Sequence, residues 1–241
     1  MVNVVRLATV DDVCQAAAAE FVKVVQEVSK TGGKHGDGHA RVVLTGGGAG
    51  IGLLRLLVDA DINWELVHIF FGDERNVAVT HPESNEGQAR EVLLDRIHIP
   101  EANIHGYGLG RGVDLGDAAE AYQAVLHDFA PQGFDLHLLG MGGEGHINSL
   151  FPHTPAVAEE TALVVPVYDS PKPPPERTTL TLPAVRSADR VWLLVAGAEK
   201  AEAAAQVVSD ADPVEWPAAG AHGLVDTTLF VAADAAGLIE S

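Results

Sequence analysis

Cysteine is nearly absent from this chain of 241 residues. Its single cysteine, Cys14, cannot form an intramolecular disulfide, and a lone thiol is typical of a reducing compartment. Cys14 lies within residues 11–28, whose pattern predicts a helix. We therefore interpret this thiol as a small buried apolar group rather than as a nucleophile.

Basic residues are also scarce. The chain has 15 Lys and Arg against 34 Asp and Glu, which gives a net charge of −19. A field of this sign repels nucleic acid and anionic membranes, so neither is an expected partner. If the ligand is an anion, local cations and backbone N–H groups must overcome the overall charge.

Long apolar runs are missing as well. No run approaches the roughly 20 residues that span a bilayer, and the N-terminus lacks the basic and then apolar layout of a signal peptide. These absences predict a cytoplasmic protein. Hydrophobic residues still make up 47% of the chain, enough for a core of good size. We expect residues 1–241 to form a single domain, and the oligomeric state, monomer or weak homodimer, is left open.

Short apolar runs alternate with helical patterns along the chain. Strands are predicted at residues 4–7, 42–44, 66–71, 134–139, 191–195 and 229–232. Helices are predicted at 11–28, capped by Thr9, and at 50–60, 84–96, 117–129 and 199–208. This alternation predicts an α/β fold with a largely parallel sheet. Two further strand-like segments, 163–167 and 178–182, flank the Pro-rich residues 171–175, which we interpret as a rigid loop.

Four of the predicted strands end in chemically unusual loops. Ligands of open α/β sheets bind at the carboxyl ends of the strands, where such loops meet. The loops are residues 45–50, 72–75, 140–146 and 197–200. Their shared edge predicts one binding or catalytic site.

The loop at 140–146 carries the clearest signal. It holds four glycines, which let a backbone approach a ligand closely, and it ends in Glu144, Gly145 and His146. Histidine is suited to proton transfer near neutral pH, so His146 is the candidate general base and Glu144 is the group that would orient it. The alternative is a histidine that only caps the following helix. The other histidines are scattered without the spacing of metal ligands, and no metal is predicted.

The other loops indicate anion binding. The glycine turn at residues 45–50 is able to hold a phosphate on backbone N–H groups at a helix N-terminus. It lacks the dinucleotide spacing, since Ile51 stands where a third glycine is needed. Arg75 is able to orient a substrate oxygen or hold a carboxylate, and Arg177, beside the prolines, and Lys200 are candidate anion ligands. The alternatives are that residues 45–50 form only a tight strand-to-helix turn, and that Arg75, Arg177 and Lys200 are solvated surface charges.

Together these motifs resemble those of the 6-phosphogluconolactonase family. The matching segments are Gly72-Asp73-Glu74-Arg75 with Ser84-Asn85, Gly140-Met141-Gly142-Gly143-Glu144-Gly145-His146 with Ser149-Leu150-Phe151-Pro152, Pro174-Pro175-Glu176-Arg177-Thr178-Thr179-Leu180-Thr181, and Gly197-Ala198-Glu199-Lys200. The resemblance implies hydrolysis of 6-phospho-D-glucono-1,5-lactone to 6-phospho-D-gluconate, in the oxidative pentose phosphate pathway. It also implies a Rossmann-like three-layer α/β/α fold and no cofactor.

The resemblance further implies a role for each matching residue. His146 would activate water, while Asp73 and Arg75 would lie in the pocket, with Arg75 helping to place substrate and base. The groups that would hold the 6-phosphate are Thr45, Gly46, Gly47, Arg177 and Lys200. This chain departs from the family pattern in having Glu144 where aspartate is usual. It also has Ile147 and Asn148 where Thr and Ala are commoner.

Three other functions stay open at this point. A glucosamine-6-phosphate deaminase or isomerase has a similar histidine loop, although this chain continues it with Ser149-Leu150-Phe151-Pro152 rather than an Asn-Glu-Pro type of segment. A non-catalytic phosphosugar sensor would keep Arg177 and Lys200 but would not need His146. A dinucleotide-binding oxidoreductase fits least well, given the failed glycine spacing.

Overall fold

The larger of two β-sheets forms the centre of the molecule. A computed structural model describes residues 1–110 and 112–240 of the chain. Six parallel strands lie in the order β1-β9-β8-β5-β2-β3. Their bounds are Asn3–Leu7 (β1), Ala40–Leu44 (β2), Val67–Phe71 (β3), Leu136–Gly140 (β5), Arg190–Val195 (β8) and Asp226–Ala232 (β9). Every strand predicted for this sheet is present, and the predicted α/β fold is confirmed.

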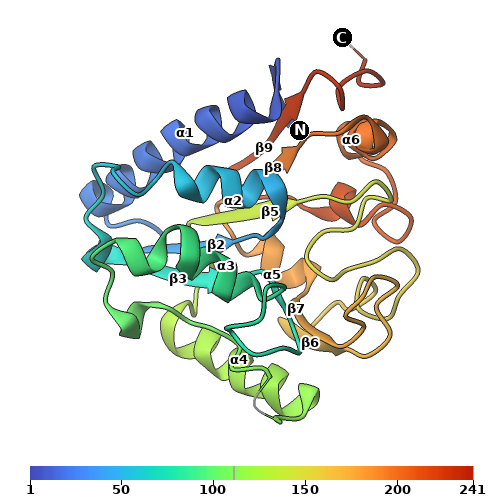
Figure 1. The fold of residues 1–241 in the computed structure, drawn as a ribbon. Helices are drawn as coiled ribbons and strands as arrows, with labels where there is room; N and C mark the ends of the chain where they lie inside the picture. The colour runs from blue at the N-terminus through green and yellow to red at the C-terminus, as the bar shows by residue number, and fades with distance from the viewer. Residues whose placement is uncertain (111, 241) are drawn as a thin grey trace.

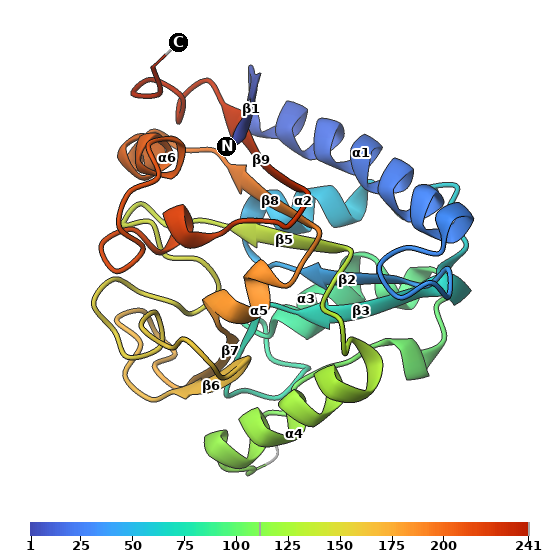
Figure 2. The same cartoon turned by 180° about the vertical axis from the view of Figure 1, so that it is seen from behind.

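Helices cover both faces of this sheet. The helices α1 (Val10–Thr31), α2 (Gly47–Arg55) and α3 (Asn85–Val92) lie on the face nearer the viewer in Figure 1. The view from behind shows α5 (Leu182–Arg186) on the opposite face (Figure 2). The described residues also form α4 (Leu115–Phe129) and α6 (Ala201–Val208). The arrangement confirms the predicted three layers.

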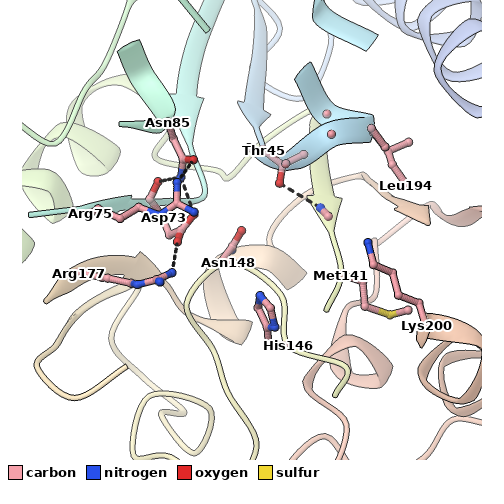
Figure 3. Close-up of a pocket in the computed structure, with 16 residues that line it drawn as sticks. Thr45, Asp73, Arg75, Asn85, Met141, His146, Asn148, Arg177, Leu194 and Lys200 are labelled. Carbon is pink, nitrogen blue, oxygen red and sulfur yellow. Dashed lines mark hydrogen bonds and ion pairs between the residues drawn. The ribbon is translucent and has the colours of Figure 1, made fainter. Parts of the chain in front are cut away.

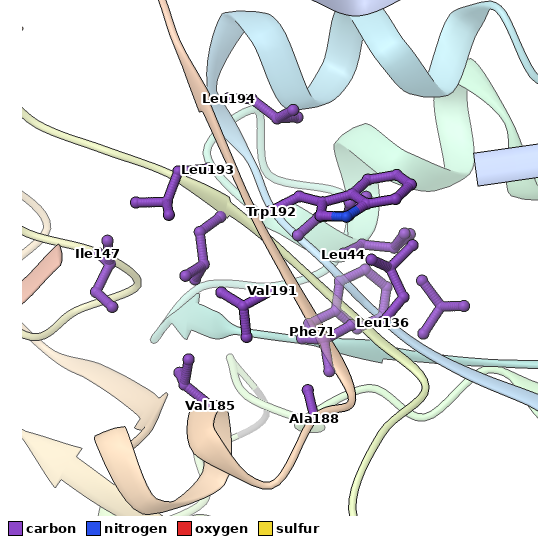
Figure 4. Packing of buried hydrophobic residues seen from close by; sticks show 14 of the residues in the cluster. Leu44, Phe71, Leu136, Ile147, Val185, Ala188, Val191, Trp192, Leu193 and Leu194 are labelled. Carbon is purple, nitrogen blue, oxygen red and sulfur yellow. The ribbon is translucent and has the colours of Figure 1, made fainter. Parts of the chain in front are cut away.

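Burial on both faces explains the apolar character of the central strands. All five residues of β2 are buried, as are most of β5 and β8. Strands of a parallel sheet covered by helices read as continuous apolar runs for this reason. Figure 4 shows Leu44, Phe71 and Leu136 packed with Val191 and Trp192 across neighbouring strands.

Several helix boundaries differ from the predicted ones. The first helix is confirmed, with Thr9 and Asp12 forming a reciprocal capping box. The helix predicted at 50–60 instead begins at Gly47 and ends at Arg55, because the glycine turn itself enters the helix. The segment 84–96 is α3, capped by Ser84, followed by a separate 3-10 turn at Leu94–Arg96. Another 3-10 turn, Ala198–Lys200, precedes α6.

A second, antiparallel sheet packs beside the first. Its strands are β4 (Asp73–Arg75), β7 (Arg177–Leu180) and β6 (Val164–Val167), in the order β4-β7-β6. The prediction of a loop at 72–75 was wrong in this respect, since residues 73–75 pair with β7 and Arg75 lies opposite Arg177. The strand predicted to reach residue 182 ends at Leu180, because Thr181 caps α5. No helix in the described residues has the length and apolarity needed to cross a bilayer.

Candidate active site

A pocket opens at the carboxyl ends of β8, β5, β2 and β3, which are adjacent in the sheet. Its empty volume is about 620 Å³, including the open mouth. Figure 3 shows side chains from all four predicted loops around this space. The predicted residues that line the pocket are Thr45, Gly46, Gly47, Asp73, Arg75, His146, Arg177 and Lys200. Glu144 contacts His146 but does not line the pocket.

Glu144 and a lysine hold the outer edge of the His146 ring. The Nδ1 atom of His146 lies 3.1 Å from Oε1 of Glu144, and the Nζ atom of Lys172 lies 2.8 Å from the same oxygen. Lys172 Nζ is also 3.4 Å from His146 Nδ1. The imidazole stacks on Phe151 with the ring centres 4.5 Å apart. Within the described chain, His146 Nε2 has no hydrogen-bond partner, so this nitrogen remains available to act as a base.

Burial and Lys172 both favour the neutral imidazole. Burial lowers the pKa of His146, the ammonium of Lys172 lowers it further, and Glu144 opposes them. For Glu144, burial raises the pKa, but hydrogen bonds from Lys172 and its own backbone N–H outweigh burial and leave the pKa lowered. His146 is therefore a neutral base at physiological pH beside an ionised, paired carboxylate.

Glycine makes this close arrangement possible. A Cβ atom on Gly142 would collide with the ring of His146 and the carboxylate of Glu144. Gly145 has a φ of +76°, a conformation that side-chain-bearing residues rarely adopt. The glycine density of the loop thus places the carboxylate and the imidazole in contact.

Asp73 lies in the pocket wall, fixed by hydrogen bonds. Ser149 Oγ donates to its Oδ2 at 2.6 Å, and Asn85 Nδ2 donates to its Oδ1 at 2.8 Å. Asn85 in turn accepts from Arg75 Nη1 at 2.6 Å. These contacts make Asp73 and Arg75 parts of one rigid wall (Figure 3).

Arg177 uses most of its donors on its own loop. Its guanidinium donates to the backbone oxygens of Lys172, Pro173 and Pro174 at 2.9, 3.3 and 2.9 Å. Its Nη1 reaches Ser149 Oγ at 3.3 Å and lies 3.8 Å from Asp73. The side chain is only 4% exposed. Arg177 therefore ties the proline loop to the pocket wall.

The glycine turn and Lys200 form the opposite side of the pocket. Gly46 is the N-cap of α2 and has no side chain to bond the first N–H groups of that helix, which are left facing the pocket. Thr45 Oγ1 accepts from the N–H of Gly140 at 3.0 Å and so joins this turn to the end of β5. Figure 3 shows the Lys200 ammonium directed toward the turn. This side has the donors and the positive charge that a phosphate needs.

Lys172 and Asn148 are among the residues of the site that sequence reasoning missed. Lys172 stands alone among prolines in the sequence, and its contact with Glu144 joins segments 28 residues apart. Asn148 has a φ of +49° and lies at the pocket wall, where Figure 3 places it between Asp73 and His146. Its departure from the commoner alanine was the only sequence signal. Neither position follows from the spacing of apolar residues.

Comparison with known proteins assigns the chain to a family. A family model described as glucosamine-6-phosphate isomerases/6-phosphogluconolactonase matches residues 8–230. The chain belongs to this family. The family includes both glucosamine-6-phosphate isomerases and 6-phosphogluconolactonases, so individual relatives are needed to distinguish the two activities.

One family member of closely similar sequence is a 6-phosphogluconolactonase from Mycobacterium tuberculosis. It is 51% identical over 214 residues, which cover 85% of this chain and 87% of that protein. The crystal structure of 6-phosphogluconolactonase from Thermotoga maritima matches with a TM-score of 0.85 and 26% identity, covering 96% of this chain and all of that one. A monomeric glucosamine-6-phosphate deaminase matches with a TM-score of 0.79 over 98% of this chain and 99% of its own, at 21% identity, which shows a shared fold alone.

Proposed function

We propose that this chain hydrolyses 6-phospho-D-glucono-1,5-lactone to 6-phospho-D-gluconate, a step of the pentose phosphate pathway, with His146 as the general base. The chain is a 6-phosphogluconolactonase by its 51% identity to the mycobacterial enzyme. The observation that carries the choice of base is the contact of His146 Nδ1 with Glu144. It leaves Nε2 as the nitrogen that is free to take a proton.

The reaction needs water made nucleophilic beside an activated ester. Neutral His146 takes a proton from water through Nε2 as the oxygen attacks C1 of the lactone. The tetrahedral intermediate collapses by breaking the bond between C1 and the ring oxygen, and the imidazolium returns its proton to that oxygen. The product has a carboxyl group at C1 and a hydroxyl at C5. A positioned general base contributes roughly 10²–10⁴-fold to such a step.

Negative charge on the carbonyl oxygen needs donors in the pocket. Arg75 lines the pocket, and its Nε is shielded from solvent without a partner in the described residues. We assign Arg75 and the backbone N–H groups of the glycine loops to this task. Asp73 holds the wall in which Arg75 stands through Asn85.

The phosphate end of the substrate fits the opposite side of the pocket. Lys200 and the backbone of Thr45, Gly46 and Gly47 supply charge and N–H groups there. Arg177 adds positive charge at the wall while its N–H groups hold the proline loop. Binding the phosphate anchors the far end of the substrate and so places the lactone against His146.

A direct assay tests this proposal. The lactone is generated in situ from glucose 6-phosphate and its dehydrogenase, and the opening rate is measured after subtraction of spontaneous hydrolysis. We expect acceleration by the wild-type chain and loss of at least about a hundredfold in His146→Ala, because the base is removed. Circular dichroism checks that the variant is folded.

Two results would argue against the assignment. Near-normal turnover in folded His146→Ala would remove His146 as the base. No acceleration by the wild-type chain would reject the lactonase, and ammonia release from glucosamine 6-phosphate would then test the deaminase chemistry of the same family. If that also failed while the chain still bound the phosphosugar, a non-catalytic sensor would be favoured.

A further inference from the structure

Lys172 contacts both members of the pair that activates water, although it does not line the pocket. Its Nζ atom lies 2.8 and 3.1 Å from the two carboxylate oxygens of Glu144 and 3.4 Å from His146 Nδ1. The residues that line the pocket include His146 but not Lys172 or Glu144. The ammonium therefore acts on the outer side of the imidazole, away from the substrate.

Arg177 holds Lys172 in this place. The buried guanidinium of Arg177 donates to the backbone oxygens of Lys172, Pro173 and Pro174. Three such bonds fix the backbone from which the lysine side chain extends. The lysine side chain itself is 47% exposed, so its position depends on this backbone and on Glu144.

Glu144 has the length to bridge the imidazole of His146 and the ammonium of Lys172. Its carboxylate reaches Nδ1 of His146 and the ammonium of Lys172 at once, through a side chain one methylene longer than the usual aspartate. A lone carboxylate beside the base would attract a proton to the imidazole and repel an anionic substrate. Pairing with an ammonium offsets both effects while keeping Nδ1–H oriented.

We propose that Lys172 is a positioning residue of this active site, which binds Glu144 and keeps the Glu144–His146 pair in its working geometry and charge state. The inference rests on the proposed function. The other charged groups around His146 are Asp73, Arg75 and Arg177 in the pocket wall and Lys200 across the pocket, and all of them are retained when Lys172 is changed. The ammonium lowers the pKa of His146, in agreement with this role.

The test is the pH profile of kcat/KM for lactone opening in Lys172→Met. We expect the acid limb to move to higher pH, because the imidazole loses a repelling cation and gains a freer carboxylate. At pH values on this limb, kcat/KM should fall by up to about fivefold, the range expected of a half-exposed ion pair. The loss should appear in kcat rather than KM, since Lys172 does not touch the pocket.

Three further variants make the result specific. Lys172→Arg keeps the charge and should restore most of the wild-type profile. Lys23→Met removes the same charge from an exposed pair on α1 and controls for net charge. In Glu144→Gln, the effect of adding Lys172→Met should be smaller than in the wild type, because the partner of Lys172 is already neutral.

The proposal is overturned if the acid limb of the kcat/KM profile lies at the same pH in Lys172→Met and in Lys23→Met. It is also overturned if the effects of Glu144→Gln and Lys172→Met are simply additive, or if only KM changes. A wild-type chain without lactonase activity would instead reject the proposed function, so the two failures are distinguishable.

Discussion

Asn148 combines a strained backbone with an unsatisfied side chain. Its φ of +49° lies in the left-handed region, and both amide atoms are shielded from solvent without a partner in the part of the chain that the structure describes. The amide packs so closely on Gly72 that a Cβ atom at Gly72 would collide with it. Such strain at a pocket wall is often kept for function, at a cost in stability.

Asn148→Gly should therefore raise the free energy of unfolding. Glycine adopts positive φ without strain, and the variant removes a buried unpaired amide, so we expect an increase of roughly 1 kcal/mol. Urea unfolding of both proteins measures it. Asn148→Ala, which removes the amide but keeps a Cβ atom at positive φ, should gain less. A lower stability of the glycine variant would show that the amide packing outweighs the strain.

The pairing of β4 with β7 places two arginines, Arg75 and Arg177, next to each other in the second sheet. Arg75 and Arg177 lie opposite each other in register, yet Arg75 bonds Asn85 and Arg177 bonds the proline loop. In β4, Glu74 lies between Asp73 and Arg75 and points to the other face, as alternation along a strand requires. It accepts hydrogen bonds from the N–H groups of Asn85 and Glu86 at the start of α3 and from Ser84 Oγ.

Glu74→Gln should weaken α3 and, through it, the site. A buried carboxylate at a helix N-terminus accepts several N–H bonds, and an amide offers only one accepting oxygen. We expect a loss of about 2 kcal/mol in the free energy of unfolding and a lower kcat, because Asn85 orients Asp73 and Arg75. Thermal unfolding and the lactone assay measure the two effects. Glu83→Gln, an exposed neighbour, is the matched control and should change neither by much.

The apolar periodicity of the sequence and the positions of the strand ends predicted the strands of this fold better than the side-chain contacts of the site. The apolar runs identified all six parallel strands, because burial on both faces leaves a continuous signal, and the parallel order then brought four loops together. The strand β4 escaped prediction because three charged residues, Asp73–Arg75, have no strand-like composition and are extended only by pairing with β7. The contact between Lys172 and Glu144 escaped because it depends on how the proline loop folds back over His146.

On the scale of the whole molecule, charge is unevenly distributed. The chain carries a net charge of −19, yet Arg75, Arg177 and Lys200 converge on one pocket with Lys172 just outside it. The electrostatic potential at a bound anion is set by these neighbouring cations. The carboxylates elsewhere on the surface contribute little, because salt screens charges that are more than about 8 Å away. A strongly acidic protein is thus able to bind an anionic sugar phosphate.

Three histidines away from the pocket, His137 and His105, which are buried, and His68, which is half-buried, make stability depend on pH. Burial lowers the pKa values of His68 and His105 to about 4, and that of His137 to about 3. His68 and His105 share a hydrogen bond of 2.9 Å between ring nitrogens, and neither ring nitrogen of His137 has a partner in the described residues. These rings are neutral in the folded protein, whereas the unfolded chain binds protons near pH 6.5.

The free energy of unfolding should consequently fall as the pH drops from about 6.5 toward 4, since the unfolded state takes up more protons. His137→Leu should reduce this slope, because it removes the residue with the largest lowering of pKa among the three. It should also raise stability at neutral pH by roughly 1–2 kcal/mol, because two unpaired buried nitrogens are replaced by an apolar group of similar size. Urea titrations at a series of pH values measure both, with the exposed His127→Gln as control. If His137→Leu kept the wild-type slope, the acid sensitivity would belong to the His68–His105 pair or to carboxylates instead.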